Sequence, residues 1–234
     1  MKKLRIVSIV LALVLLLAAC GGGTTGDEET AKPAGATDAL TSEPTDAPTP
    51  TDVPTPSPVP TADPSIAEGT NVALTADVDT TTSTGQTHVQ WGWSYEFLND
   101  GVIEATAEST GWSSMVSENH EEPETEQWIE FELFTYTYIN KVILYPSRNG
   151  TFFPVDFKIQ VSTNGSKFTD VAEVTGCELS VTKTGEPVTL EFDTVMAKYV
   201  RVYISKYCET PDETDGYLCQ MAEIEILAAA APEV

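Results

Sequence analysis

Basic residues are scarce in this chain of 234 residues. It contains 12 Lys and Arg residues against 36 Asp and Glu residues, a formal net charge of −24 at pH 7. Proteins that bind nucleic acid neutralise its phosphates with Lys and Arg, so this balance excludes nucleic acid as a partner. Anionic lipid and teichoic acid are disfavoured for the same reason. Neutral or cationic partners remain.

Histidine and the common catalytic motifs are equally scarce. Only His88 and His120 are present, and the chain has no G-x-S-x-G, Cys-x-x-Cys or His-x-x-His pattern. Carboxylates are plentiful between Glu121 and Glu126. A glycosidase, however, needs two of them at a defined separation, and a cluster within one polar loop is more typical of a charged surface. The sequence therefore predicts a protein that is not an enzyme.

Cysteine is also rare, with four residues in total. In an exported domain, the three that lie beyond Cys20 suggest one disulfide and one remaining thiol. Cys208 and Cys219 bracket a polar loop between the last two expected strands, and antiparallel neighbours at the base of a loop can reach disulfide distance. We predict that these two pair. A Cys177–Cys208 bridge and three reduced thiols are the alternatives.

The N-terminus has no hydrophobic run long enough for a confident membrane span, because the apolar stretch covers only Ile6–Leu17. A basic segment precedes it and small residues follow it, so residues 1–19 are predicted to be a signal peptide. The end of this stretch, Leu17-Ala18-Ala19-Cys20, resembles the lipobox of bacterial lipoproteins. That resemblance implies that Cys20 carries lipid, the only membrane contact, and holds the protein at the extracellular face of the bacterial cell membrane. A secretory signal with a chance cysteine is the alternative.

Large apolar residues are nearly absent from residues 20–65, where Thr, Pro, Ala and Asp dominate. Such a segment cannot bury enough surface to offset its ordering entropy, so it is predicted to be a disordered linker, extended by its prolines. Residues 66–228 are long enough for one domain with a real core. Residues 229–234 are expected to be a frayed tail.

The domain does contain a succession of short alternating runs. Trp128–Phe134 places Ile129, Phe131 and Leu133 on one side of a strand and two glutamates on the other. Similar runs follow, separated by turn residues such as Asn164-Gly165, and no window of comparable length has a helical period. The pattern predicts an all-β sandwich or barrel. Trp112 and Trp128 are expected in its core.

Several segments resemble, in their order along the chain, the factor V/VIII type C (discoidin) domain, and within it the bacterial family 32 carbohydrate-binding modules. They are Asn99–Gly101, Thr110–Ser114, Trp128–Leu133, Val142–Pro146, Phe153–Gly165, Lys198–Val202 and Gln220–Ile226. The resemblance implies a galactose-binding-like jelly-roll β-sandwich, with five strands packed against three and ligand loops at one end. We expect a monomer.

The same resemblance implies a structural calcium site. Its ligands would be the side chains of Asp100, Thr110 and Glu223, and the carbonyls of Phe97, Val102 and Ala222. Carboxylate, hydroxyl and carbonyl oxygens are the ligands that a hard cation selects. The segment between Asp100 and Thr110 is longer than in the family pattern, so Ser109 or Glu108 could replace Thr110. A solvated loop without metal is the alternative.

A sugar site needs an aromatic face for the apolar side of a pyranose and planar polar groups for its hydroxyls. The candidates are Trp91, Trp93, His120, Arg148, Asn149, Phe152, Phe153 and Tyr217. In the resembling modules an Arg and an Asn commonly follow the strand that ends in Tyr-Pro, and Arg148 and Asn149 stand there. The alternatives are a salt bridge for Arg148, a core position for a tryptophan and a solvated His120.

Together these features predict a cell-surface lipoprotein that presents a single non-catalytic carbohydrate-binding module. Its ligand is expected to be a neutral glycan of the galactose type. The alternative is a protein–protein or surface adhesion module of an envelope complex without sugar specificity, in which Phe152 and Phe153 would serve as apolar contacts.

Overall fold

The structure is a computed structural model that describes residues 58–80, 92–114, 127–209 and 216–233. Cys20, Trp91 and His120, which the sequence singles out, lie outside these residues. The strands are β1 (Asp77–Thr80), β2 (Trp112–Ser113), β3 (Gln127–Pro146), β4 (Asp156–Ser162), β5 (Thr169–Val174), β6 (Val188–Lys206), β7 (Cys208–Glu209), β8 (Tyr217–Leu218) and β9 (Gln220–Ala228). The short helices are η1 (Val72–Thr75), η3 (Tyr95–Leu98), η5 (Arg148–Gly150) and α1 (Leu179–Thr182). No helix of this part of the chain is long and apolar enough to cross a membrane.

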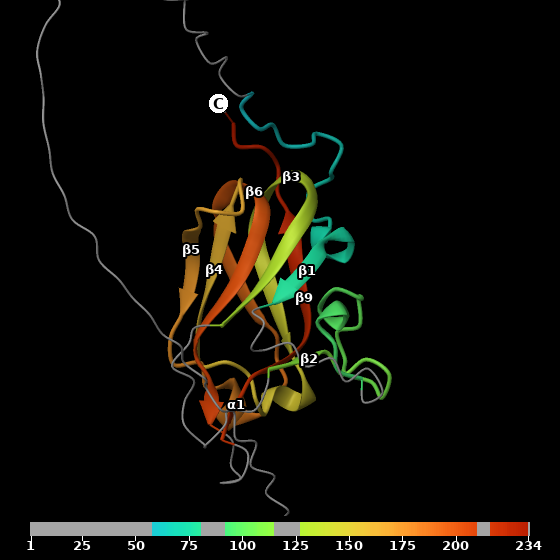
Figure 1. Cartoon of the computed structure of the whole chain (residues 1–234), viewed down its shortest axis with the longest axis vertical. Coiled ribbons are helices and arrows are strands. Elements are labelled where there is room, and N and C mark those ends of the chain that lie inside the picture. The colour runs from blue at the N-terminus through green and yellow to red at the C-terminus, as the bar shows by residue number, and fades with distance from the viewer. Residues whose placement is uncertain (1–57, 81–91, 115–126, 210–215, 234) are drawn as a thin grey trace, which may run out of the picture. The chain divides into compact units, whose positions relative to one another are not determined.

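Two long strands, β3 and β6, belong to both layers of the sandwich (Figure 1). The first half of β3 pairs with β1 and with the second half of β6, which continues to β4 and β5. A register shift between Glu132 and Thr137 bends β3, and its second half pairs with β9 and the first half of β6. Such bends let one strand pass from sheet to sheet. The layers are therefore β1-β3-β6-β4-β5 and β6-β3-β9-β2, which are continuous through β3 and β6. The predicted all-β jelly-roll sandwich is confirmed.

The core follows the predicted alternation. Ile129, Phe131 and Leu133 are at most 1% exposed, and Ile224 and Ile226 of β9 are completely buried. Each such side chain stabilises the fold by roughly 1.5–3 kcal/mol relative to exposure. Trp112 is also completely buried, as predicted. The result is a rigid frame whose ends present the loops.

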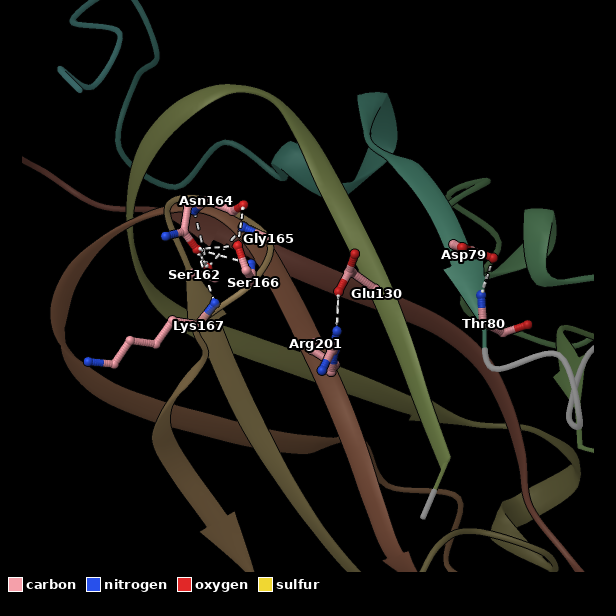
Figure 2. A network of polar contacts seen from close by, with 9 residues as sticks. All are labelled: Asp79, Thr80, Glu130, Ser162, Asn164, Gly165, Ser166, Lys167 and Arg201. Atoms are coloured by element: carbon pink, nitrogen blue, oxygen red, sulfur yellow. Dashed lines mark hydrogen bonds and ion pairs between the residues drawn. The ribbon is translucent and has the colours of Figure 1, made fainter. Parts of the chain in front are cut away.

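Trp128 does not belong to this core, and its prediction as a core residue is wrong. It alternates with Ile129 and therefore shares the outer face of β3 with Glu130. There the Arg201 guanidinium lies 4.6 Å from the Trp128 ring centroid and 3.7 Å from that of Phe168. Figure 2 shows Arg201 with its ion-pair partner Glu130, whose Oε2 is 2.7 Å from Nη2. The charge of Arg201 is therefore neutralised by Glu130 on the outer face of the sheet.

The predicted turn at Asn164-Gly165 is confirmed (Figure 2). The Oδ1 atom of Asn164 accepts hydrogen bonds from the backbone N–H groups of Ser166 and Lys167 at 3.0 and 3.1 Å. Gly165 has a φ of +71°, a conformation that glycine adopts without steric cost. The turn joins β4 to β5 at the end of the sandwich where β3 bends.

The predicted disulfide is absent, because Cys177, Cys208 and Cys219 of the described chain are all free thiols. The register of β7 and β8 pairs Cys208 with Leu218 rather than with Cys219. Cys219 directly follows β8 and is completely buried next to Cys208, but the two thiols are not bonded. The Cys208 thiol donates instead to the carbonyl of Glu209 at 3.3 Å.

Candidate functional site

The loop after β3 has an unusual backbone. Arg148, Asn149 and Gly150 have φ values of +49°, +60° and +76°, three left-handed residues in succession. Left-handed backbone at a residue other than glycine costs of order 1–3 kcal/mol and is concentrated at functional sites. The strain is held in place by Ser147, whose buried hydroxyl donates to the carbonyl of Thr110 at 2.9 Å. The loop is thereby fixed to the segment before β2.

Arg148 lies against Trp93. Its guanidinium carbon is 5.1 Å from the centroid of the Trp93 ring, within the range of a cation–π interaction. The five ion pairs of the described residues use Lys141, Lys158, Lys198 and Arg201, and none uses Arg148. In the described part of the chain, Arg148 is therefore held by an aromatic ring and not by a carboxylate. Arg148 is also exposed.

Trp93 supports this arginine and is not an open stacking surface. The residue is 8% exposed, and its backbone forms a bridge with Gly111. Because Arg148 lies over the ring, a sugar could stack on Trp93 only after the arginine moved. Trp93 is thus better suited to fixing the orientation of Arg148.

Asn149 lies next to Arg148 on an exposed loop that touches the segment after α1. A side chain at Gly185 would stand 3.4 Å from the Asn149 Oδ1 atom, so Gly185 and Asn149 are in close approach. Gly150 is similarly tight, because a side chain there would lie 2.8 Å from Leu179. The structure thus brings Trp93, Arg148 and Asn149 together. Ser147, which pins their loop, was missed because a serine after Tyr-Pro carries no distinguishing signal.

Phe152 and Phe153 have different environments. Phe153 is completely buried and packs edge-on against Phe157, with ring centroids 5.7 Å apart and planes at 83°. The prediction that Phe153 contacts a ligand is wrong, because its ring completes the core beneath the loop. Phe152 is half-buried, and its carbonyl accepts a hydrogen bond from Gln220 at 2.8 Å. Tyr217 is also half-buried and packs against the core from β8.

The contrast between the two phenylalanines can be tested by stability. Phe153→Ala is expected to lower the free energy of unfolding by about 3–5 kcal/mol, because it opens a cavity in the core. Phe152→Ala, the matched change one residue earlier, should cost less than about 1.5 kcal/mol. Urea denaturation of both variants measures the difference. Equal losses would contradict the assignment of Phe153 to the core.

The predicted metal ligands gather at the edge formed by β9 and the loop after η3. Glu223 is completely buried; its Oε1 accepts the N–H of Gly101 at 3.2 Å, and its Oε2 has no hydrogen-bond partner. Asp100 accepts from the N–H of Val102 and from the hydroxyl of Ser109, both at 2.8 Å. Burial raises the pKa of Glu223 to about 8; the Gly101 hydrogen bond opposes this rise and the charge of Asp100 adds to it.

These groups fit a hard cation. A buried carboxylate oxygen without a donor is costly unless a cation or proton satisfies it. No group of three or more His, Cys, Asp or Glu residues converges within the described ranges, so a cation here would need hydroxyl and carbonyl oxygens besides two carboxylates. Ser109 is already bonded to Asp100, whereas the Thr110 hydroxyl donates to the carbonyl of Thr106 at 3.2 Å. The contacts favour Ser109 as the hydroxyl ligand.

The fold and the loop-end geometry define a β-sandwich binding domain. Residues 79–224 match the F5/8 type C domain, and the chain belongs to this family. No curated protein sequence matches the chain.

Three solved structures illustrate the likeness of fold. CpGH89CBM32-5 from Clostridium perfringens, in complex with GalNAc-β-1,3-galactose, is 21% identical with a TM-score of 0.51, over 68% of this chain and 100% of that one. A variant of chitosan-binding module 1 from a Paenibacillus sp. IK-5 chitosanase/glucanase is 23% identical with a TM-score of 0.50, over 69% and 100%. The family 32 module of Clostridium perfringens NanJ, in complex with galactose, is 16% identical with a TM-score of 0.50, over 69% and 99%.

Proposed function

We propose that this protein is a non-catalytic carbohydrate-binding lipoprotein that displays one F5/8 type C domain at the extracellular face of a bacterial membrane. The observation that carries the proposal is the strained loop that presents Asn149 beside Arg148, whose guanidinium lies over Trp93. A guanidinium edge and an amide, both fixed by backbone geometry, are the planar groups that reach neighbouring sugar hydroxyls. Sugar complexes of structurally similar modules, with galactose and GalNAc-β-1,3-galactose, support a neutral ligand of the galactose type.

The second half of β3 separates the N-terminal entry of the domain from the ligand loop. The N-terminal segment reaches the domain at the bend of β3, where the N–H of Asp63 donates to the carbonyl of Tyr136 at 2.8 Å. From this bend, the second half of β3 runs to Pro146 over ten residues, or roughly 30 Å at ~3.3 Å per residue. Arg148 follows at its far end. With Cys20 lipidated, the tether would therefore join the domain at the end opposite the ligand loop.

Calcium has a supporting role in this proposal. Asp100, Ser109 and Glu223 would hold the ion, which would supply the positive charge that the buried carboxylate lacks. The bound ion would fix the segment before β2, whose Thr110 carbonyl accepts the hydrogen bond that pins Ser147. It would act on the position of the loop and not on the sugar.

Replacement of Arg148 tests the ligand site. In calorimetric titrations of the full chain with galactose-type oligosaccharides, we expect Arg148→Ala to weaken binding by about 10–100-fold, the value of a hydrogen bond to a charged donor. Asn149→Gly, which keeps the left-handed backbone, should also weaken it. Lys167→Ala removes the same charge from an exposed residue at the other end of the domain and should change nothing.

Two outcomes would contradict the proposal. Failure of the full chain to bind any neutral glycan on an array would remove the sugar function and favour a protein partner in the envelope. Binding that Arg148→Ala and Asn149→Gly leave intact would place the site elsewhere on the domain.

A further inference from the structure

A hollow lies at the opposite end of the domain from Arg148. It has a volume of about 410 Å³ and opens between the segment from Asp63 to Thr75 and the bend of β3. Ile66 and Ala67 contribute apolar surface, and five of its lining residues carry hydroxyl groups. A volume of this size, apolar with a few polar groups, is typical of a small-ligand site.

Phe134 stands at this hollow and is 83% exposed. Its position is fixed by the Lys198 ammonium, which donates to the carbonyls of Leu133 and Phe134 and forms an ion pair with Glu132 at 3.2 Å. Lys198 therefore holds the bend of β3 in place, and the bend exposes the Phe134 ring to solvent. An exposed aromatic ring beside hydroxyl-lined space offers a face for the apolar side of a pyranose.

Among the described residues that line the hollow, Asp63 is the only charged one. Its Oδ1 accepts the hydroxyl and the N–H of Ser65 at 2.7 and 2.9 Å, and its own N–H bonds to Tyr136, two residues beyond Phe134. These contacts hold the carboxylate beside the bend. The Ser65 hydrogen bonds also lower the pKa of Asp63, so the group stays ionised. With a net charge of −24, the chain attracts cations to such a site.

We propose that this hollow is a second carbohydrate site, which takes a protonated amino sugar with its ring against Phe134 and its ammonium group at Asp63. The neutral site at the Arg148 loop and this site would then bind different sugar units from opposite ends of the domain. The proposal does not depend on the function of the Arg148 loop, because the two sites share no residue.

The test uses the full chain and two probes, a glucosamine trisaccharide and its N-acetylated form. They have the same ring hydroxyls, but only the first carries ammonium groups. We expect the glucosamine form to bind about two- to fivefold more tightly, the value of an exposed ion pair, and to shift the amide resonances of Ile66 and Thr135. Binding should weaken as salt is raised from 50 to 500 mM, because a single exposed ion pair is screened.

Variants locate the site. Phe134→Ala should reduce the affinity at least tenfold, and Asp63→Asn should remove the preference for the glucosamine form. Val59→Ala changes a residue with the same exposure, 83%, that does not line the hollow, and it should have no effect. Arg148→Ala should leave the Ile66 and Thr135 shifts intact. Unchanged affinity in Phe134→Ala, or equal binding of both trisaccharides, would overturn the proposal, whether or not the Arg148 loop binds a neutral glycan.

Discussion

Calcium is expected to raise the unfolding temperature of the full chain by roughly 5–10 °C at pH 8, and by clearly less at pH 5.5. A ligand at a hundred times its dissociation constant stabilises the native state by about 2.7 kcal/mol. For a domain of this size, each kcal/mol corresponds to roughly 2–4 °C. The basis is Glu223, which is buried with one carboxylate oxygen unsatisfied.

The pH dependence follows from the sign of the Glu223 shift. Its pKa is about 8 in the fold, above the ordinary value of 4.5. Between these values the metal-free native state binds more protons than the unfolded state, so its stability falls as pH rises from about 4.5 to 8. Calcium must displace this proton at low pH, and therefore binds more tightly as pH approaches 8. Thermal unfolding measured with calcium and with chelator, across this range, gives both trends.

The Glu223→Gln substitution removes the charge of this side chain and keeps its shape. The amide resembles the protonated acid, so the variant should be about as stable as the native protein at pH 5.5. It should also lose the fall in stability towards pH 8 and the response to calcium. Glu104→Gln, which changes an exposed carboxylate in the loop that contains Asp100, is the matched control and should retain both. A calcium response that survives Glu223→Gln would show that the ion binds at another site.

The frame of the domain could be predicted from the sequence because its strands have one buried face. In Trp128–Phe134 the alternation fixes which residues enter the core, and Ile129, Phe131 and Leu133 are buried as predicted. The pattern is ambiguous for the aromatic residues themselves. Trp128 has the parity of the glutamates and lies outside, and the pair Phe152-Phe153 gives no indication of which ring turns inward.

The site could be predicted only in part, because its contacts join segments that are distant in the chain. The placement of Arg148 after β3 was predictable, but its stacking on Trp93 depends on how two loops meet. Asp100 and Glu223 could be proposed as neighbours only from a family resemblance. That one oxygen of Glu223 has no donor is a property of the packing and carries no local signal. That Cys208 lies opposite Leu218 and not opposite Cys219 likewise depends on the register of β7 and β8.

Gly111→Ala is expected to lower the free energy of unfolding by more than about 4 kcal/mol. Gly111 has a φ of +103°, and a β-carbon there would lie 2.1 Å from the Met221 carbonyl oxygen and 2.5 Å from the Ala222 α-carbon. Both contacts are backbone, so no side-chain rotation can relieve them. Gly176→Ala is the matched control: its φ is +66°, with nothing within 4 Å of the added carbon. It should cost only the left-handed penalty, about 1–2 kcal/mol.

The two variants also differ in what they do to the calcium response. Gly111 directly precedes β2, whose Trp112 lies opposite Met221 of β9. Ser109 and Thr110 come directly before Gly111. An added carbon at this position must push β2 away from β9, and so moves Ser109 and its partner Asp100 away from Glu223. Gly111→Ala protein that still folds should therefore lose the calcium shift, while Gly176→Ala keeps it. If both variants lose similar stability by urea denaturation and both retain the shift, the close approach of β2 to β9 is not what assembles the metal ligands.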